Sequence, residues 1–239
     1  MLSPAYVGSF LLLAVTCAIA AGLLLGLRVP TSATPVGPAQ GRAWQEIVLQ
    51  PTYLVALFGA ATGYGIMILA MTATPIAMLH HDHALSAAAT VIQLHVLGMF
   101  LPSFFTGALI ARFGVLRVML TGIALLAGHV VMTLTGTEFI SFAGALILLG
   151  VGWNFLYVGG TTLLTSTYVP AEKGRAQAIN DMSIFVVGLA CSISAGVLLQ
   201  TLGWQALNLV LLPWLGSAAL AFLWLGHRNR HAAAAAPAD

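Results

Sequence analysis

The stretch from Leu85 to Met119, LSAAATVIQLHVLGMFLPSFFTGALIARFGVLRVM, decides how the rest of the chain is interpreted. After Ser86 it runs for about 25 residues without a charge, enough to cross a bilayer core of about 30 Å at about 1.5 Å per residue. A short turn with an arginine at each end, Arg112 to Arg117, separates this run from a second apolar run. The pattern predicts an antiparallel pair of membrane-spanning helices, and Pro102 is expected to bend the first of them near its midpoint.

The composition indicates that lipid is the natural solvent of this protein. Of its 239 residues, 60% are hydrophobic and 6% are charged, whereas a soluble domain has roughly 25% charged residues. The net charge of +2 gives no indication of nucleic-acid binding. Cys17 and Cys191 lie inside apolar runs, which favours buried free thiols over a disulfide. We therefore expect an all-α polytopic integral membrane protein.

Seven stretches are predicted to cross the membrane. They are residues 5–27, 52–78, 87–111, 118–135, 139–164, 177–200 and 204–225. The first has no basic residue before its apolar core, so residues 1–27 are expected to be a retained span rather than a signal peptide. Residues 28–51 contain four prolines and charges of both signs, which predicts a linker that ends in a short interfacial helix. Residues 227–239 are predicted to be a disordered tail.

The basic residues predict how the chain is oriented. If the seven spans alternate in direction, every lysine and arginine falls on one side of the membrane: Arg28, Arg42, Arg112, Arg117, Lys173, Arg175, Arg228 and Arg230. The opposite side receives Asp82, Glu138 and a histidine cluster. Basic loops favour the cytoplasm, so the N-terminus is expected outside and the linker and C-terminus inside.

Three segments resemble the major facilitator superfamily. GALIARFGVLR (107–117) resembles the G-x-x-x-D-R-x-G-R-R turn of that family, although Ala111 stands where the family usually has an acid. PAEKGRA (170–176) resembles its turn between helices ten and eleven. The glycine-rich run from Gly188 to Trp204 is similar to its eleventh helix and the start of the twelfth.

The resemblance implies a domain organisation. Residues 52–226 correspond to helices seven to twelve, a six-helix bundle built from two inverted three-helix repeats. Residues 1–27 then correspond to helix six, and residues 28–51 to the central cytoplasmic loop. Helices one to five have no counterpart, so the resemblance implies that an N-terminal half or a second copy is required.

The turn and the following glycines have physical roles that can be stated from the residues. Gly107 and Gly114 are expected to permit a close helix approach and a tight turn. Arg112 and Arg117 anchor the turn among anionic headgroups and can bond the last carbonyls of the preceding helix, with either topology anchoring or gating as their purpose. In the penultimate span, Gly188, Ser192 and Gly196 recur every fourth residue and predict a packing seam, which is either static or a sliding surface. A family member would also use Asp181 in a cytoplasmic latch, but stabilisation of a helix N-terminus is the alternative explanation.

Polar groups at membrane depth are costly and therefore mark candidate solute contacts. Asn154 and Tyr157 are three residues apart on one helix face, and Trp153 neighbours Tyr157 at i+4. An amide, a phenol and an indole suit an aromatic or hydroxylated organic solute, whereas interhelical bonding and packing are the alternative. Tyr64 and Gln93 are further candidates.

His95 is the candidate for proton coupling, although a neutral histidine bonded to a neighbouring helix is the alternative. His80, His81 and His83 surround Asp82, but neighbouring histidines on a short loop seldom form a closed metal site, so no metal or cofactor is expected.

The sequence contains no phosphate-binding loop, nucleophile elbow or H-E-x-x-H motif, so we do not expect an enzyme. The favoured function is a secondary carrier, or the C-terminal part of one, that moves a small organic solute by alternating access and is coupled to protons. The expected location is a bacterial inner membrane. A truncated MFS-like membrane protein with a structural or regulatory role and no transport is the alternative.

Overall fold

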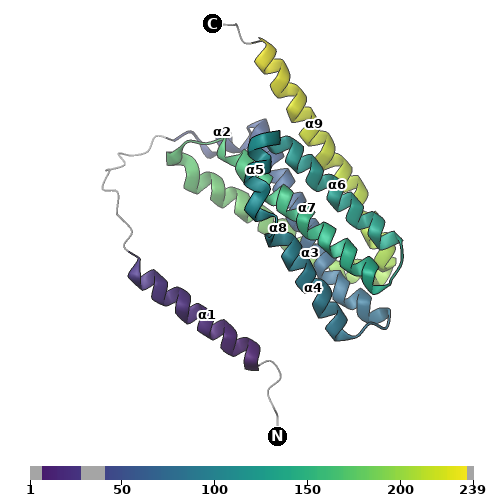
Figure 1. Cartoon of the computed structure of the whole chain (residues 1–239). Coiled ribbons are helices and arrows are strands. Elements are labelled where there is room, and N and C mark those ends of the chain that lie inside the picture. Colours follow the sequence, from purple (N-terminus) through teal and green to yellow (C-terminus); the bar gives the residue numbers. More distant parts are fainter. Residues whose placement is uncertain (1–6, 28–40, 236–239) are drawn as a thin grey trace. The chain divides into compact units, whose positions relative to one another are not determined.

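The computed structural model describes residues 7–27 and 41–235 of the chain (Figure 1). They belong to two separate units, which divide between Gln40 and Gly41. In the first unit, α1 (Val7–Gly26) has 20 uncharged residues, and none of them is buried. The helix is long and apolar enough to cross a membrane, as predicted for residues 5–27. Cys17 on this helix is exposed within its unit, contrary to the expectation of a buried thiol, whereas Cys191 is buried.

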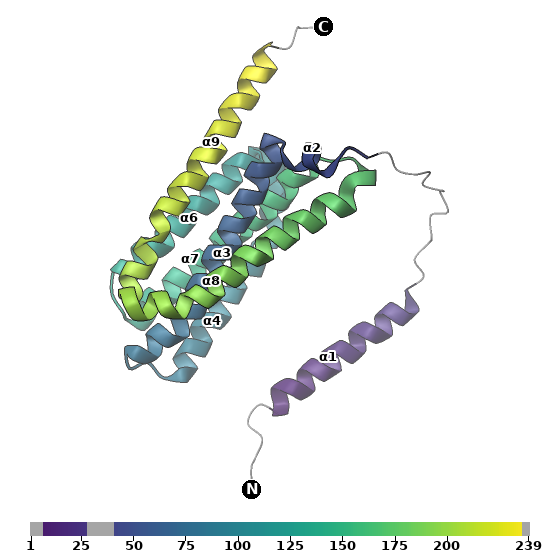
Figure 2. The ribbon, with the colours of Figure 1, turned by 180° about the vertical axis from the view of Figure 1, so that it is seen from behind.

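The second unit is an all-α bundle, and the described residues contain no strand. Its elements are α2 (Trp44–Val48), α3 (Pro51–His80), α4 (Leu85–Phe100), α5 (Ser103–Phe113), α6 (Val115–Leu134), α7 (Phe139–Thr165), a 3-10 turn (Pro170–Glu172), α8 (Lys173–Leu209) and α9 (Leu211–Ala235). The short helix α2 lies where the sequence predicted an interfacial helix. In both views α3 runs through the middle of the bundle, where it packs against α7, α8 and α9 (Figures 1 and 2).

Five helical segments are long and apolar enough to cross a membrane, or six when the bent pair α4–α5 is one span. Six spans are one fewer than the seven predicted. The difference arises because the 3-10 turn, α8 and α9 follow one another almost without interruption and form one apolar segment of 63 residues, Pro170–Ala232. A straight helix of this length would measure about 95 Å, roughly three bilayer cores. The chain instead turns at Gly203, which has φ 77° and ψ 172°, and α9 returns along α6 (Figure 2). The segment therefore holds both of the last two predicted spans.

The proline bend predicted in the span of residues 87–111 is present. α4 ends at Phe100 and α5 begins at Ser103, with an angle of 41° between them. Pro102 lies between the two helices, where its ring and its missing N–H interrupt the backbone ladder. The bend leaves carbonyl groups at the end of α4 that need other partners.

Helix α7 makes the closest helix contacts of the bundle, through glycines that the sequence did not single out. A Cβ atom at Gly150 would lie 2.6 Å from the carbonyl oxygen of His95 on α4. Gly122 on α6 faces Gly152 on α7, and a Cβ added to either glycine would lie 3.0 Å from the carbonyl oxygen of the other glycine. At both crossings only glycine lets the two backbones approach this closely. These crossings fasten α4 and α6 to α7.

Of the three residues predicted to form a packing seam on the penultimate span, Gly188 alone packs closely within the described bundle. An added Cβ at Gly188 would meet the ring of Tyr64 at 2.5 Å, but Ser192 is exposed and a Cβ at Gly196 would meet nothing within 4 Å. Because a helix has 3.6 residues per turn, a four-residue repeat drifts around the axis by about 40° at each step. The buried side of α8 instead follows Ala176, Asn180, Ile184, Gly188, Cys191, Ala195 and Leu199.

In the turn between α5 and α6, Gly114 has an unusual backbone conformation, whereas Gly107 makes no close contact with another helix. Gly114 has φ 86°, a conformation that residues with a side chain rarely adopt. The close approach expected at Gly107 is not present, because a Cβ there would meet no atom within 4 Å. Among the described residues, the side chains of Arg112 and Arg117 form no hydrogen bond, so they do not bond the last carbonyls of α5. The Arg112 guanidinium instead lies 5.3 Å from the ring centre of Phe113.

Two helix ends also differ from the sequence-based expectation. α8 begins at Lys173, so Asp181 lies more than two turns inside the helix. The helix dipole acts mainly on the first turn, and it therefore does not explain this acid. α9 continues to Ala235, so residues 227–235 are helical where a disordered tail was expected. The alanines from Ala232 onward favour helix more than any other residue. Residues 236–239 lie outside the described part.

Candidate functional site

The centre of the candidate site is a pair of stacked rings on α7. Trp153 and Tyr157 lie one turn apart, with ring centres 5.0 Å apart and planes inclined by 13°. Trp153 is 8% exposed and its indole Nε1 has no hydrogen-bond partner, whereas Tyr157 is half-buried. A buried donor without a partner is costly, so this N–H is an unsatisfied polar group within the candidate site.

The stack is extended by rings from three other helices into what we call the aromatic row. Tyr64 on α3 lies 6.4 Å from Tyr157, and Phe185 on α8 lies 5.7 Å from Tyr64. At the other end, Phe100 on α4 lies 6.3 Å from Trp153. The terminal rings are the exposed ones, at 58% for Phe100 and 56% for Phe185. The row therefore crosses one side of the bundle and is accessible at both ends.

The structure thus brings together three residues chosen from the sequence, Tyr64, Trp153 and Tyr157. Their role in binding stays a prediction. The two terminal phenylalanines were missed, as were the methionines packed beneath the row: Met67, Met71 and Met99. Tyr64, Met67 and Met71 follow a helical spacing of three and four residues, and this signal could have been found from the sequence.

Asn154 lies beside the row but is fully engaged in the fold. Its amide nitrogen donates to the Met99 carbonyl at 2.8 Å and to the Ser103 hydroxyl at 2.7 Å. Its oxygen accepts from the Thr106 hydroxyl at 2.6 Å. The side chain is 1% exposed, so these bonds bridge the break between α4 and α5 away from any solute. The geometry favours the interhelical role over direct binding.

Gln93 and His95 point to different sides of α4, as their spacing predicted. Gln93 is exposed, two turns before Phe100 on the same face. His95 is fully buried, and its Nδ1 lies 2.9 Å from the Leu146 carbonyl on α7. Its Nε2 is buried without a partner. Gln93 therefore lies on the exposed face of α4, which we call the open face, whereas His95 is enclosed between two helices.

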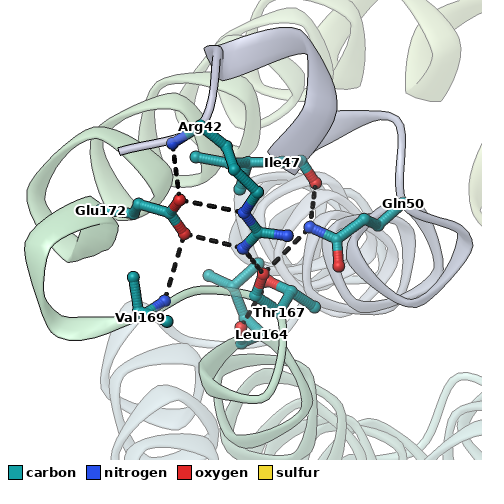
Figure 3. A network of polar contacts seen from close by, with 7 residues as sticks. All are labelled: Arg42, Ile47, Gln50, Leu164, Thr167, Val169 and Glu172. Carbon is teal, nitrogen blue, oxygen red and sulfur yellow. Dashed lines mark hydrogen bonds and ion pairs between the residues drawn. The ribbon is translucent and has the colours of Figure 1, made fainter. Parts of the chain in front are cut away.

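A network of polar contacts fastens the segment before α3 to the turn before α8 (Figure 3). Arg42 forms an ion pair with Glu172 at 2.7 Å, and its Nε and backbone N–H both donate to the other carboxylate oxygen, at 3.0 and 2.9 Å. The guanidinium also donates to the Thr167 carbonyl at 3.0 Å, and Gln50 donates to the same oxygen. We call the Arg42–Glu172 pair and its carbonyl contact the linker clamp.

The linker clamp strongly lowers the pKa of its acidic residue, Glu172. The Glu172 side chain is 3% exposed and that of Arg42 is 42% exposed. The hydrogen bonds from Arg42 lower the pKa of Glu172 to about 2, and the same bonds raise the pKa of Arg42. The sequence did not reveal this pair, because its members are 130 residues apart.

The remaining candidates are spread over the bundle ends. Asp181 is exposed and accepts a hydrogen bond from the neighbouring Asn180 at 3.0 Å. In the histidine cluster, Nε2 of His83 lies 2.7 Å from the Thr137 carbonyl. Within the described residues, no three His, Cys, Asp or Glu side chains are placed to hold a metal.

Comparison with known proteins gives three bacterial relatives. The chain is 40% identical over 210 residues to "Riboflavin transporter RfnT" of Brucella anthropi, which covers 87% of this chain and 53% of the relative. It is 35% and 34% identical to the "Uncharacterized MFS-type transporter" proteins YdeG and YddS of Bacillus subtilis, over 61% and 65% of this chain and 34% and 39% of those relatives. The chain thus spans about half the length, or less, of the curated relatives it matches. No solved structure gives a significant match.

The family comparison matches the same part of the chain as the bundle. The Major Facilitator Superfamily is matched over residues 55–238, which begins in α3 and includes all later helices. The match and the transporter-named relatives agree with the apolar spans, the bent α4–α5 pair and the Gly114 turn. This chain is an integral membrane protein that belongs to the major facilitator superfamily of transporters.

Proposed function

We propose that this chain forms the C-terminal half of a secondary carrier that moves a small, flat aromatic solute by alternating access. The aromatic row is the observation that carries the proposal. It offers a stacked indole and phenol, an unpartnered N–H and accessible ends on one side of the bundle. An N-terminal half, or a second copy, would face the row and enclose the solute. The six spans formed by α3 to α9, with α4 and α5 as one bent span, would then form two inverted repeats.

Riboflavin is the first solute to test. The relative that matches over 87% of this chain is named a riboflavin transporter. Riboflavin carries a planar three-ring heteroaromatic system with ring carbonyls, which suits stacking on Trp153 and Tyr157 and a hydrogen bond from the indole N–H. Gln93 on the open face would provide a further polar contact.

We propose His95 as the proton-coupling residue. Its Nδ1 is held by the Leu146 carbonyl, and its unpartnered Nε2 provides a place for a proton. In a working carrier, His95→Gln should remove the dependence of uptake on a pH gradient while downhill exchange of solute continues. Uptake by this variant that still follows the gradient would exclude His95.

We also propose that the N-terminus lies outside and the C-terminus inside a bacterial inner membrane. The α5–α6 turn, the start of α8 and the end of α9 lie at one end of the bundle with α2 (Figure 1). Six of the seven described lysines and arginines lie in these elements, and the seventh, Arg42, lies two residues before α2. Alkaline phosphatase fused after Thr137, at the opposite end, should be active, whereas a fusion after Arg230 should be inactive. The reverse pattern would contradict the proposed orientation.

Uptake in cells tests the central proposal. The chain would be expressed alone and together with the N-terminal part of the Brucella riboflavin transporter that it does not match, in a strain that cannot make riboflavin. Riboflavin uptake with the restored part supports the carrier. Uptake by the chain alone would indicate that two copies build the path. No uptake in either case, despite normal membrane insertion of the chain and of an intact transporter control, would favour a non-transporting membrane protein.

A further inference from the structure

The structure contains a basic cavity that the transport proposal does not use. It lies between the start of α6 and the end of α9 and has a volume of about 610 Å³. Three basic side chains line it, namely Arg117, His227 and Arg230, and no carboxylate does among the described residues. We call it the α6–α9 cavity.

The charges of the α6–α9 cavity are not neutralised within the described chain. The described residues contain one ion pair, between Arg42 and Glu172. Arg117 and Arg230 therefore have no acidic partner among the described residues. Both arginines are exposed. In addition, no side chain caps the N-terminus of α6, and its first three residues, whose backbone N–H groups have no partner within the helix, are among the residues that line the cavity. An anion in the cavity would therefore meet two guanidinium groups and a helix N-terminus.

The walls of the cavity are apolar below the charges. Phe113, Leu120 and Phe222 line it, and a second cavity of about 360 Å³ shares Phe113 and Arg117 with it. The other residues of that second cavity are mainly apolar, including Leu109, Val118 and Phe155. Arg117 thus stands between a basic cavity and an apolar one. A free anion has no use for apolar walls, whereas a phospholipid has both a charged headgroup and acyl chains.

The position along the bundle fits the headgroup layer. The cavity lies at the end of the bundle that collects the basic residues, where Arg228 covers the half-exposed ring of Trp224 at 5.7 Å. Tryptophan and arginine are enriched where a membrane helix leaves the hydrocarbon, and basic pockets between spans at this level bind anionic headgroups. We propose that the α6–α9 cavity binds the phosphodiester headgroup of an anionic phospholipid. Arg117, Arg230 and the α6 N-terminus hold the phosphate, and the acyl chains lie along the apolar walls.

Lipid retention measured by native mass spectrometry tests this site. The delipidated 239-residue chain would be titrated with phosphatidylglycerol, with the zwitterionic phosphatidylcholine, and with inorganic phosphate as a competitor. The native chain should keep one phosphatidylglycerol, bound at least about tenfold more tightly than phosphatidylcholine. Arg117→Gln combined with Arg230→Gln should lose about tenfold in this affinity.

Two further variants separate the cavity from general surface charge. Arg175→Gln combined with Arg228→Gln removes the same charge outside the cavity lining and should retain the lipid. Gly226→Leu changes no charge but fills the cavity, and it should weaken retention. The first atom of the leucine side chain fits here, because an added Cβ at Gly226 would lie an ordinary 3.6 Å from Leu116.

Each other outcome overturns the proposal. Equal loss in both arginine pairs would mean that the lipid responds only to overall charge. Displacement by millimolar inorganic phosphate would assign the site to a free anion rather than a lipid. Equal affinity for the two lipids would remove the headgroup specificity. If the double variant does not fold, Arg230→Gln alone serves the same test, because Arg230 lies exposed near the end of α9.

Discussion

At the scale of single residues, Asn154 shows why a polar group at membrane depth is an ambiguous signal. Its amide supplies partners for the carbonyl and hydroxyl groups at the α4–α5 break. A sequence shows that such a group lies at membrane depth, but it does not show whether a helix break or a solute uses it. The break at Pro102 was predictable, whereas the side chain that bridges it was not.

Asn154→Ala should therefore lower stability as well as transport. The substitution leaves the Met99 carbonyl and the Ser103 hydroxyl without the amide donor, whereas the Thr106 hydroxyl keeps the Pro102 carbonyl, and we expect a cost of about 2 kcal/mol. The melting temperature of the purified protein in detergent should fall. Gln93→Ala, which removes an exposed amide from the open face, should melt like the native chain. An unchanged melting temperature for Asn154→Ala, with reduced uptake, would instead assign Asn154 to the solute.

The linker clamp predicts an asymmetry between its two partners. Arg42→Ala leaves a nearly buried carboxylate without its cation, whereas Glu172→Gln leaves an arginine that already reaches solvent. The melting temperature should fall further for Arg42→Ala than for Glu172→Gln, and Arg175→Ala should have little effect. Equal melting temperatures for all three variants would show that the clamp contributes nothing.

The clamp should also make stability depend on pH in the acidic range. Because the pKa of Glu172 falls from 4.5 to about 2 on folding, its stabilisation is fully present above about pH 4.5 and is lost as the pH falls toward 2. The difference in melting temperature between the native chain and Glu172→Gln should be constant near neutral pH and shrink below about pH 4.5. A difference that does not change with pH would contradict the assignment.

At the scale of helices, the crossings at α7 depend on backbone contact. An added Cβ at Gly150 would lie 2.6 Å from a backbone oxygen, which cannot move without shifting α4. We expect Gly150→Ala to destabilise the bundle by about 1–3 kcal/mol. Gly196→Ala meets nothing within 4 Å and should instead be neutral or stabilise by up to about 1 kcal/mol. Equal shifts in melting temperature for the two variants would contradict this packing.

The helices also show which features of the fold could be predicted from the sequence. Apolar length located the spans, Pro102 located the bend, and Gly114 located the turn, because each property acts locally. The chain has 25 glycines, and local sequence does not reveal that Gly150 meets α4 while Gly196 meets nothing within 4 Å. The Trp153–Tyr157 stack was predictable from one helix, whereas Phe100 and Phe185 join it only when four helices are assembled.

At the scale of the whole molecule, the described bundle has one side on which rings from four helices gather. Its apolar surface and its relatives identify a transporter fold, and the chain matches about half the length of the riboflavin transporter. A carrier that alternates between two openings needs a second surface opposite the row. The proposed carrier therefore depends on contact between the aromatic row and the solute.

The most direct test of this claim is the KM for riboflavin uptake in cells that hold the chain and the restored N-terminal part. Tyr157→Ala removes the central ring of the row and should raise KM about tenfold or more, because stacking on an aromatic side chain contributes about 1–3 kcal/mol. Phe104→Ala, which removes a 90% exposed ring outside the row, should leave KM unchanged. A native KM for Tyr157→Ala, at normal abundance in the membrane, would show that the solute does not pass along the aromatic row.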